Sequence, residues 1–180
     1  IDAFRDVATR LGLSFLPEEQ FDLRVAEGAP RVRLIDMVRA YGTLANNGRY
    51  TDLYAIDRIT ERGADGQEIE VPLQLTTEER QAVSPQVAYL MQNILSDDSS
   101  RAQSQFGQNS QLTLANLGYP TRNVVGSVSG TSSEGRDLWT VGFTQNAVVG
   151  VWLGTFDNSP TINQTGFTAA APLWNAVMRE

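Results

Sequence analysis

The stretch GSVSGTSSEGRDLWTVGFT, from Gly126 to Thr144, gathers hydroxyl side chains, glycines and a turn at the end of a predicted strand. Small residues beside hydroxyl groups let a backbone approach a ligand closely, so this layout suits an acyl group or an anion. Glu134 and Asp137 carry the only side chains in it that could accept a proton at neutral pH. Three interpretations follow: a catalytic strand, the remnant of one, or a polar hairpin.

The basic residues of the whole chain restrict the chemistry further. All 14 are arginines, and the 180 residues contain no Lys, His or Cys. A serine nucleophile normally needs His or Lys to take its proton, and cysteine or zinc chemistry needs thiolates or imidazoles. We therefore expect no catalytic residue, no metal and no cofactor in this chain, and no nucleophilic catalysis by the chain alone.

Charge and length limit the partners. A net charge of -7 with scattered arginines argues against nucleic acid and anionic membranes, because phosphate binding needs clustered cations. No apolar run approaches the roughly 20 residues that cross a bilayer, and no signal peptide is visible, so we expect no membrane contact by this segment. A chain of 180 residues is typical of one domain. Because it opens directly in a helical pattern, we expect a piece of a longer protein.

Residues 1–123 read as mainly helical, with one small hairpin. Apolar periodicity predicts a helix that stops at Gly12, a helix from Leu34 that ends at Asn46-Asn47-Gly48, and a helix capped by Ser84 with Pro85 at its first position. The third helix has its apolar residues on one face: Val87, Leu90, Met91, Ile94 and Leu95. Between these helices we expect an ordered loop (13–30), a hairpin of 54–62 with 68–75, and a long polar loop (97–120).

Residues 124–180 predict a sheet and a closing helix. Three short strands, 124–129, 138–144 and 148–153, are joined by brief turns that suit an antiparallel meander. The third strand is apolar on both faces and needs cover on each, which a helix over 169–178 supplies on one side. The fold class is α+β, an antiparallel sheet flanked by helices, incomplete as a fragment. Residues 1–180 form a single domain.

Four segments in order carry a resemblance to a known family. They are MVRAYGTLANNGRY (37–50), SPQVAYLMQNIL (84–95), GRDLWTVGFTQNAVVGVWLGTFDNSP (135–160) and GFTAAAPLWNAVM (166–178). Together they resemble the C-terminal half of the transpeptidase domain of class A penicillin-binding proteins, in the penicillin-binding/serine beta-lactamase superfamily. The resemblance implies peptidoglycan cross-linking by an active serine, an extracytoplasmic location in a membrane-anchored parent, and a stem peptide or beta-lactam as ligand. It also implies a partner, the N-terminal half of the domain.

The family's motifs are only partly present. Ser-x-x-Lys needs a lysine, and Ser-x-Asn should precede residue 1; the third motif, Lys-Thr-Gly-Thr, aligns on Val128-Ser129-Gly130-Thr131 and continues into Ser132. Valine thus replaces the lysine that orients the substrate carboxylate, a loss of about 2–4 kcal/mol in the transition state. By resemblance Ser129 still donates to a carboxylate, Gly130 allows close approach, and the Thr131 amide forms half of an oxyanion hole. Ser129, Gly130, Thr131 and Ser132 are the predicted substrate-binding remnant.

Three functions remain open: a catalytically inactive transpeptidase fragment, a non-catalytic module that binds stem peptide or protein, and an architectural remnant.

Individual residues outside the motif also allow alternatives. Arg136 forms a turn salt bridge with Asp137 or supplies the missing cation. Trp139 and Trp152 suit a half-buried sheet better than a stacking platform. Adjacent acids suit solvated surface better than a metal site, because they do not face one point: Glu18-Glu19, Glu78-Glu79 and Asp97-Asp98. The 148–153 strand leaves an apolar edge, which predicts a homodimer, a strand swap or a local rearrangement.

Overall fold

A computed structural model of the chain describes residues 1–17, 19, 21–73, 77–103, 110–114 and 125–180. Its centre is a three-stranded antiparallel sheet in the order β5-β6-β7, with β5 at Gly126–Thr131, β6 at Asp137–Phe143 and β7 at Val148–Gly154. The predicted meander is therefore confirmed, with bounds shifted by one or two residues. The expected start of the first strand, Val124, lies outside the described residues.

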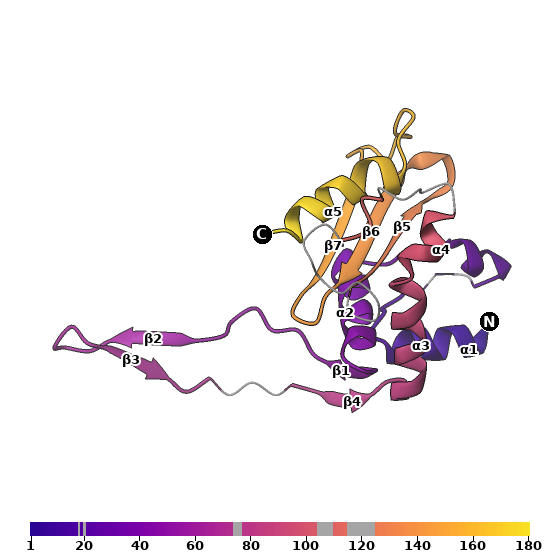
Figure 1. The fold of residues 1–180 in the computed structure, drawn as a ribbon. Helices are drawn as coiled ribbons and strands as arrows, with labels where there is room; N and C mark the ends of the chain where they lie inside the picture. The colour runs from indigo at the N-terminus through magenta and orange to yellow at the C-terminus, as the bar shows by residue number, and fades with distance from the viewer. Residues whose placement is uncertain (18, 20, 74–76, 104–109, 115–124) are drawn as a thin grey trace.

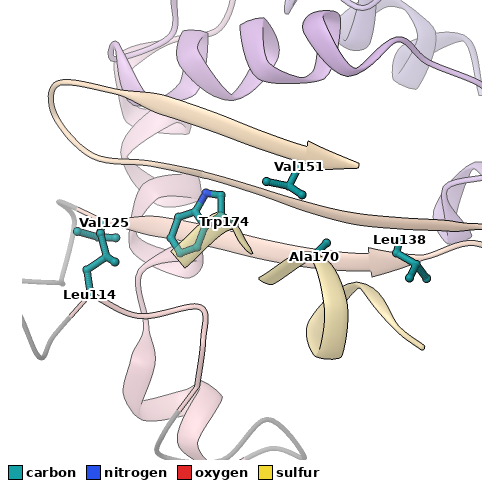
Figure 2. Close-up of a cluster of buried hydrophobic side chains, with 6 residues drawn as sticks. All are labelled: Leu114, Val125, Leu138, Val151, Ala170 and Trp174. Atoms are coloured by element: carbon teal, nitrogen blue, oxygen red, sulfur yellow. The ribbon is translucent and has the colours of Figure 1, made fainter. Parts of the chain in front are cut away.

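The C-terminal helix covers one face of this sheet (Figure 1). It begins as a π-helical turn, η4 (Gly166–Ala170), and continues as α5 (Ala171–Val177). Figure 2 shows the core that results, which consists of Leu114, Val125, Leu138, Val151, Ala170 and Trp174. Trp174 is fully buried, and its indole packs directly on Gly142. A Cβ at position 142 would collide with this indole and would lie 2.8 Å from the Gly126 carbonyl oxygen. The expected closing helix is thus present.

The opposite face of the sheet packs on α2 (Leu34–Ala45). A Cβ on Gly150 of β7 would lie 2.6 Å from Val38, so the helix approaches the strand where no side chain intervenes. As predicted, α2 ends in a left-handed turn, with φ of 53° at Asn47 and 79° at Gly48. The sheet is therefore covered on both faces, which satisfies the apolar pattern of β7.

The helix α3 (Pro85–Leu95) begins as predicted, because the Ser84 hydroxyl accepts a hydrogen bond from the Val87 amide at 3.3 Å. Its buried face coincides only in part with the predicted one, because Met91 packs on the cluster of Leu44, Val83 and Ala88. The helix packs on α2 through Ala88 and Gln92, whose side-chain amide donates to the Leu44 carbonyl at 2.6 Å. Three of the five apolar residues predicted for that face are exposed, with exposed fractions of 47, 59 and 66% for Val87, Leu90 and Ile94.

The other elements are short. They are α1 (Asp2–Arg10), η1 (Leu23–Glu27), β1 (Arg49–Thr51), β2 (Ile59–Arg62), β3 (Glu68–Val71), β4 (Glu79–Gln81), α4 (Asp98–Ala102) and η3 (Ser133–Gly135). The predicted hairpin is present as β2–β3, with shorter strands, and it projects from the body (Figure 1). The pairing of β1 with β4 was not predicted from the sequence. Leu75, the predicted end of the hairpin, lies outside the described residues.

Candidate ligand-binding cleft

The strand β5, which carries the predicted motif remnant, lies at one side of the sheet. Among the described residues it pairs only with β6, in a register that sets Val128 opposite Val141 and Thr131 opposite Leu138. Residues directly opposite each other share a face, so Val128 lies on the α2 side of the sheet, and Ser129 and Thr131 lie on the α5 side.

Two hydrogen bonds fix which backbone groups of β5 point away from β6. The Ser132 amide donates to the Asp137 carbonyl at 2.9 Å, toward β6, whereas the Ser127 carbonyl accepts from the Arg101 guanidinium at 3.1 Å. Backbone groups alternate in direction along an antiparallel strand. The amides and carbonyls of Ser129 and Thr131 therefore face outward, as those of Ser127 do.

A pocket of about 290 Å³ adjoins this edge. Its described lining comes from the end of α3, from α4 and from β5: Ile94, Leu95, Asp97, Ser100, Arg101, Leu112, Ser127, Val128 and Ser129. Val128, together with Ile94, Leu95 and Leu112, contributes to the apolar part of this lining. The pocket brings one of the four predicted binding residues, Ser129, together with residues from a different part of the chain.

The hydroxyl groups of the remnant have different partners. The Thr131 hydroxyl accepts a hydrogen bond from the Gly166 amide at 2.9 Å, at the start of η4. The Ser132 hydroxyl donates to the Asp137 carboxylate at 2.9 Å and accepts from the Asp137 amide at 2.8 Å. Among the described residues nothing bonds to the Ser129 hydroxyl, so it remains the hydroxyl available to a ligand.

Gly166 holds β5 in place from the α5 side. A Cβ at this glycine would lie 2.5 Å from the Trp139 carbonyl oxygen and closer still to that of Gly130. The Thr140 hydroxyl donates to the Gly166 carbonyl at 3.2 Å, so the turn is tied to both β5 and β6. Gly130, by contrast, has open space beside it, with the nearest atom 3.9 Å from a built Cβ.

Arg136 lies in the turn that follows β5. Its guanidinium pairs with the Glu134 carboxylate and donates to the Asn158 carbonyl, while Asp137 accepts from Ser132 and from the Trp152 indole at 3.0 Å. The turn salt bridge is therefore present with a partner different from the one predicted. The arginine that lines the pocket is Arg101.

Arg101 is the main residue of this region that sequence reasoning missed. Its side chain is 12% exposed, forms an ion pair with Asp98, and donates to the carbonyls of Leu95 and Ser127. Burial lowers the pKa of Arg101, and the Asp97 and Asp98 carboxylates oppose that effect. Asp98 and Arg101 are three residues apart, a spacing that suits an ion pair on a helix and could have indicated α4. The sequence prediction placed both residues in a polar loop instead.

The remaining sequence interpretations concern aromatic and acidic residues. Trp139 and Trp152 form a cross-strand pair, the first half-buried and the second 42% exposed, as expected for sheet residues. Glu78 pairs with Arg80 at 2.7 Å, and Asp97 accepts from the Ser100 amide and caps α4. Glu18 lies outside the described residues. Within the described ranges, no group of three or more acidic residues could hold a metal ion, and no helix is long and apolar enough to cross a bilayer.

Comparison with known proteins identifies the family. Residues 23–179 match the model of the penicillin binding protein transpeptidase domain. Penicillin-binding protein 1A of Clostridium botulinum (strain Langeland) is 30% identical over 144 residues, which cover 80% of this chain and 16% of that protein. Penicillin-binding protein 1A of Neisseria lactamica is 28% identical over 172 residues, which cover 92% and 20%. This chain therefore spans about a fifth or less of the curated relatives.

A solved structure shares the fold. The PonA1 protein from Mycobacterium tuberculosis, determined in complex with penicillin V, superposes with a TM-score of 0.71 at 23% identity. The match covers 98% of this chain and 48% of that one. It confirms the α+β architecture of an antiparallel sheet with helices. Together with the family model, it confirms the resemblance drawn from the four sequence segments. The chain belongs to the family of penicillin-binding protein transpeptidase domains.

Proposed function

We propose that this chain is the C-terminal half of a transpeptidase domain that serves peptidoglycan synthesis outside the cytoplasm, in a membrane-anchored parent, and that it does not catalyse cross-linking by itself. Residues 1–180 form one part of a single domain. One observation carries the proposal: β5 presents Val128-Ser129-Gly130-Thr131 along an edge of the sheet beside a pocket, where the family's motif begins with lysine.

The chemistry of the chain supports the inactive role. In the family, a serine attacks a D-Ala-D-Ala stem peptide, and a lysine beside it takes the proton. This chain has neither lysine nor histidine to accept a proton, and Val128 offers no charge to the substrate carboxylate. The outward amide of Thr131 and the Ser129 hydroxyl retain the capacity to donate hydrogen bonds. We infer a cleft that can still hold a peptide backbone without accelerating its reaction.

Fluorescent penicillin tests the inactive role in the longer protein that carries this chain. We expect little covalent labelling of the wild type and a gain of labelling in the Val128→Lys variant, provided that the preceding half supplies a serine. Competition with unlabelled penicillin separates specific from non-specific signal. Robust labelling of the wild type contradicts the proposal.

A second candidate is a non-catalytic module that binds stem peptide or protein. It is favoured by the unpartnered Ser129 hydroxyl and by the outward amides of Ser129 and Thr131 beside the pocket. A titration of the chain with stem peptide, followed by NMR, should shift these two amide signals. If they do not move at millimolar peptide, the binding role is refuted and the purely architectural role remains.

Two surfaces suggest the partners. The face of α3 formed by Val87, Leu90 and Ile94 is exposed, and β7 pairs with β6 on one side only among the described residues. We propose that the N-terminal half of the domain covers both, and that without it the chain dimerises or swaps strands through β7. Sedimentation of the purified chain tests this. A stable monomer at high concentration, with β7 amides exchanging rapidly, contradicts it.

A further inference from the structure

The β2–β3 hairpin is an arm with no cover on either face. Among the described residues its two strands pair only with each other, and none of their side chains is buried. The hairpin extends away from the body that carries α3 and β7 (Figure 1). A two-stranded hairpin by itself is marginally stable in water, because it has no third strand or helix to pack on. Cover on one face would therefore stabilise this arm.

The strand register gives the hairpin one apolar face. Ile59 lies opposite Val71, and Glu61 lies opposite Ile69. Because directly opposite residues share a face, three branched apolar side chains lie together beside one carboxylate. Ile59 and Ile69 are 39% and 49% exposed, so this face is open to a partner. The other face carries only polar and charged side chains: Thr60, Arg62, Glu68 and Glu70.

Local hydrogen bonds define the tip of the hairpin. The Gly63 amide donates to the Gln67 carbonyl at 2.8 Å, and the Gly66 amide donates to the Gly63 carbonyl at 2.9 Å. A Cβ on Gly63 would lie 3.1 Å from the Cδ1 atom of Ile69, so the isoleucine side chain lies over the turn. The apolar face therefore continues to the tip.

The base of the arm is clamped to the body. The Asp52 carboxylate accepts hydrogen bonds from the Tyr50 hydroxyl at 2.5 Å and from the Glu78 amide at 3.1 Å. The guanidinium groups of Arg39 and Arg80 lie over the Tyr50 ring, at 5.4 and 4.1 Å from its centre. These contacts fix the point at which the arm leaves the body. A partner that docks on the arm therefore has less freedom to remove.

The charge of the arm restricts what can cover it. Residues 52–73 carry six carboxylates and two guanidinium groups, a net charge of -4. The acidic residues are Asp52, Asp57, Glu61, Asp65, Glu68 and Glu70. A second copy of the arm would carry the same charge and would be repelled, as would an anionic membrane surface. A surface with basic side chains is complementary to it.

We propose that the apolar face of the hairpin, formed by Ile59, Ile69 and Val71, docks on another protein at an apolar surface bordered by lysine or arginine side chains. Further apolar residues of the arm, each more than half exposed, lie between this face and the body: Leu53, Tyr54 and Ile56. The docking face does not include β5, α3 or β7, so the proposal does not depend on the proposed function.

A peptide that combines apolar and basic side chains tests this chemistry on the 180-residue chain. The probe is acetyl-Leu-Lys-Leu-Lys-Leu-Lys-amide, and two control peptides carry serine in place of leucine or glutamate in place of lysine. We expect the probe to bind at least tenfold more tightly than either control, with NMR shifts of the Ile59 and Ile69 methyl groups. Equal binding of the serine peptide, or shifts confined to another surface, overturns the inference.

Variants locate the binding on one face of the hairpin. Ile69→Ser should weaken the probe about tenfold, and Thr60→Ala, on the opposite face, should leave its affinity unchanged. If Ile69→Ser disturbs the hairpin, as judged by the amide signals of the turn, Ile59→Ser replaces it with the same expected loss. An unchanged affinity in the variant used, with the turn signals preserved, contradicts the assignment of the face.

Photo-cross-linking in the longer protein identifies the occupant. A benzophenone amino acid in place of Ile69 should yield an adduct with a different protein, whereas the same group in place of Glu70 should not. The cross-linked segment of the partner should lie on an apolar surface bordered by lysine or arginine. The absence of an adduct overturns the proposal, and so does an adduct with lipid, with a second copy or with another part of the same chain. Dimerisation through β7 would persist in Ile69→Ser, which separates that prediction from this one.

Discussion

Replacing Gly166 with alanine tests whether the contact between η4 and β5 holds the motif strand in position. Alanine would normally be favoured at such a site, because it restricts the unfolded chain and suits a helix better than glycine, by up to about 1 kcal/mol. The structure predicts the opposite sign. The added methyl group would meet the carbonyl oxygens of Gly130 and Trp139, the second at 2.5 Å, and both belong to the hydrogen-bonded backbone of β5 and β6.

The expected cost follows from these contacts. Forcing a methyl group into a packed site costs about 1–3 kcal/mol. Moving η4 away would also weaken two hydrogen bonds, from the Gly166 amide to the Thr131 hydroxyl and from the Thr140 hydroxyl to the Gly166 carbonyl, each worth about 1 kcal/mol. Against a gain of up to about 1 kcal/mol, we expect a net loss of about 2–4 kcal/mol. For a chain of this size that lowers Tm by about 4–16 °C.

Thermal unfolding followed by circular dichroism measures this loss, and Gly130→Ala is the matched control. Gly130 takes part in the same contact, but a Cβ added to it would have its nearest neighbour 3.9 Å away. The Tm of the Gly130→Ala variant should therefore differ little from that of the wild type. The Thr131 amide signal should move in Gly166→Ala, because its side chain loses a donor. A Gly166→Ala protein as stable as the wild type, or more stable, refutes the account of how β5 is positioned.

Three further predictions concern polar contacts. Asp137→Ala should lower the stability by about 1–3 kcal/mol and shift the fluorescence of Trp152 to the red, because the indole loses its 3.0 Å acceptor; unchanged emission contradicts this. Arg101→Met should cost about 3–5 kcal/mol in urea unfolding, since Asp98 loses its ion-pair partner while it keeps the hydrogen bond from the Thr113 hydroxyl, and adding Asp98→Asn should recover part of that loss. The Tyr50 hydroxyl and the Glu78 amide hold the pKa of Asp52 below its ordinary value, so its contribution to stability is present above about pH 4 and is lost as the pH falls through the folded-state pKa. Asp52→Asn should therefore flatten the acid side of the stability profile, and a profile parallel to the wild type refutes that origin.

Local signals in the sequence predicted the elements of this fold well. Ser84 and Pro85 mark the start of α3, and Gly12 follows α1 with a φ of 99°. Such signals act over a few residues, so they are visible without tertiary information. The three strands of the sheet were equally legible, because each is a short apolar run between turn residues.

The buried face of α3 could not be predicted in the same way. Its apolar residues outnumber the positions that α2 covers, and α2 contacts the small side of the helix through Ala88 and Gln92. The Gln92 amide bonds to the Leu44 carbonyl, 48 residues away, and compensates for its own burial. Only the tertiary arrangement decides between such faces. The hydrogen bond of the Thr131 hydroxyl could not be predicted for the same reason, because the donor is the amide of Gly166, 35 residues away in the sequence.

The valine at position 128 is consistent with its surroundings. It lines the pocket with three other aliphatic residues, Ile94, Leu95 and Leu112, near an arginine whose charge Asp98 balances. At this half-buried position an apolar side chain needs no hydrogen-bond partner, whereas a lysine would have to extend its ammonium group to solvent or to a carboxylate. The substitution that the proposed function interprets as the loss of a cation is therefore also compatible with the local packing of β5.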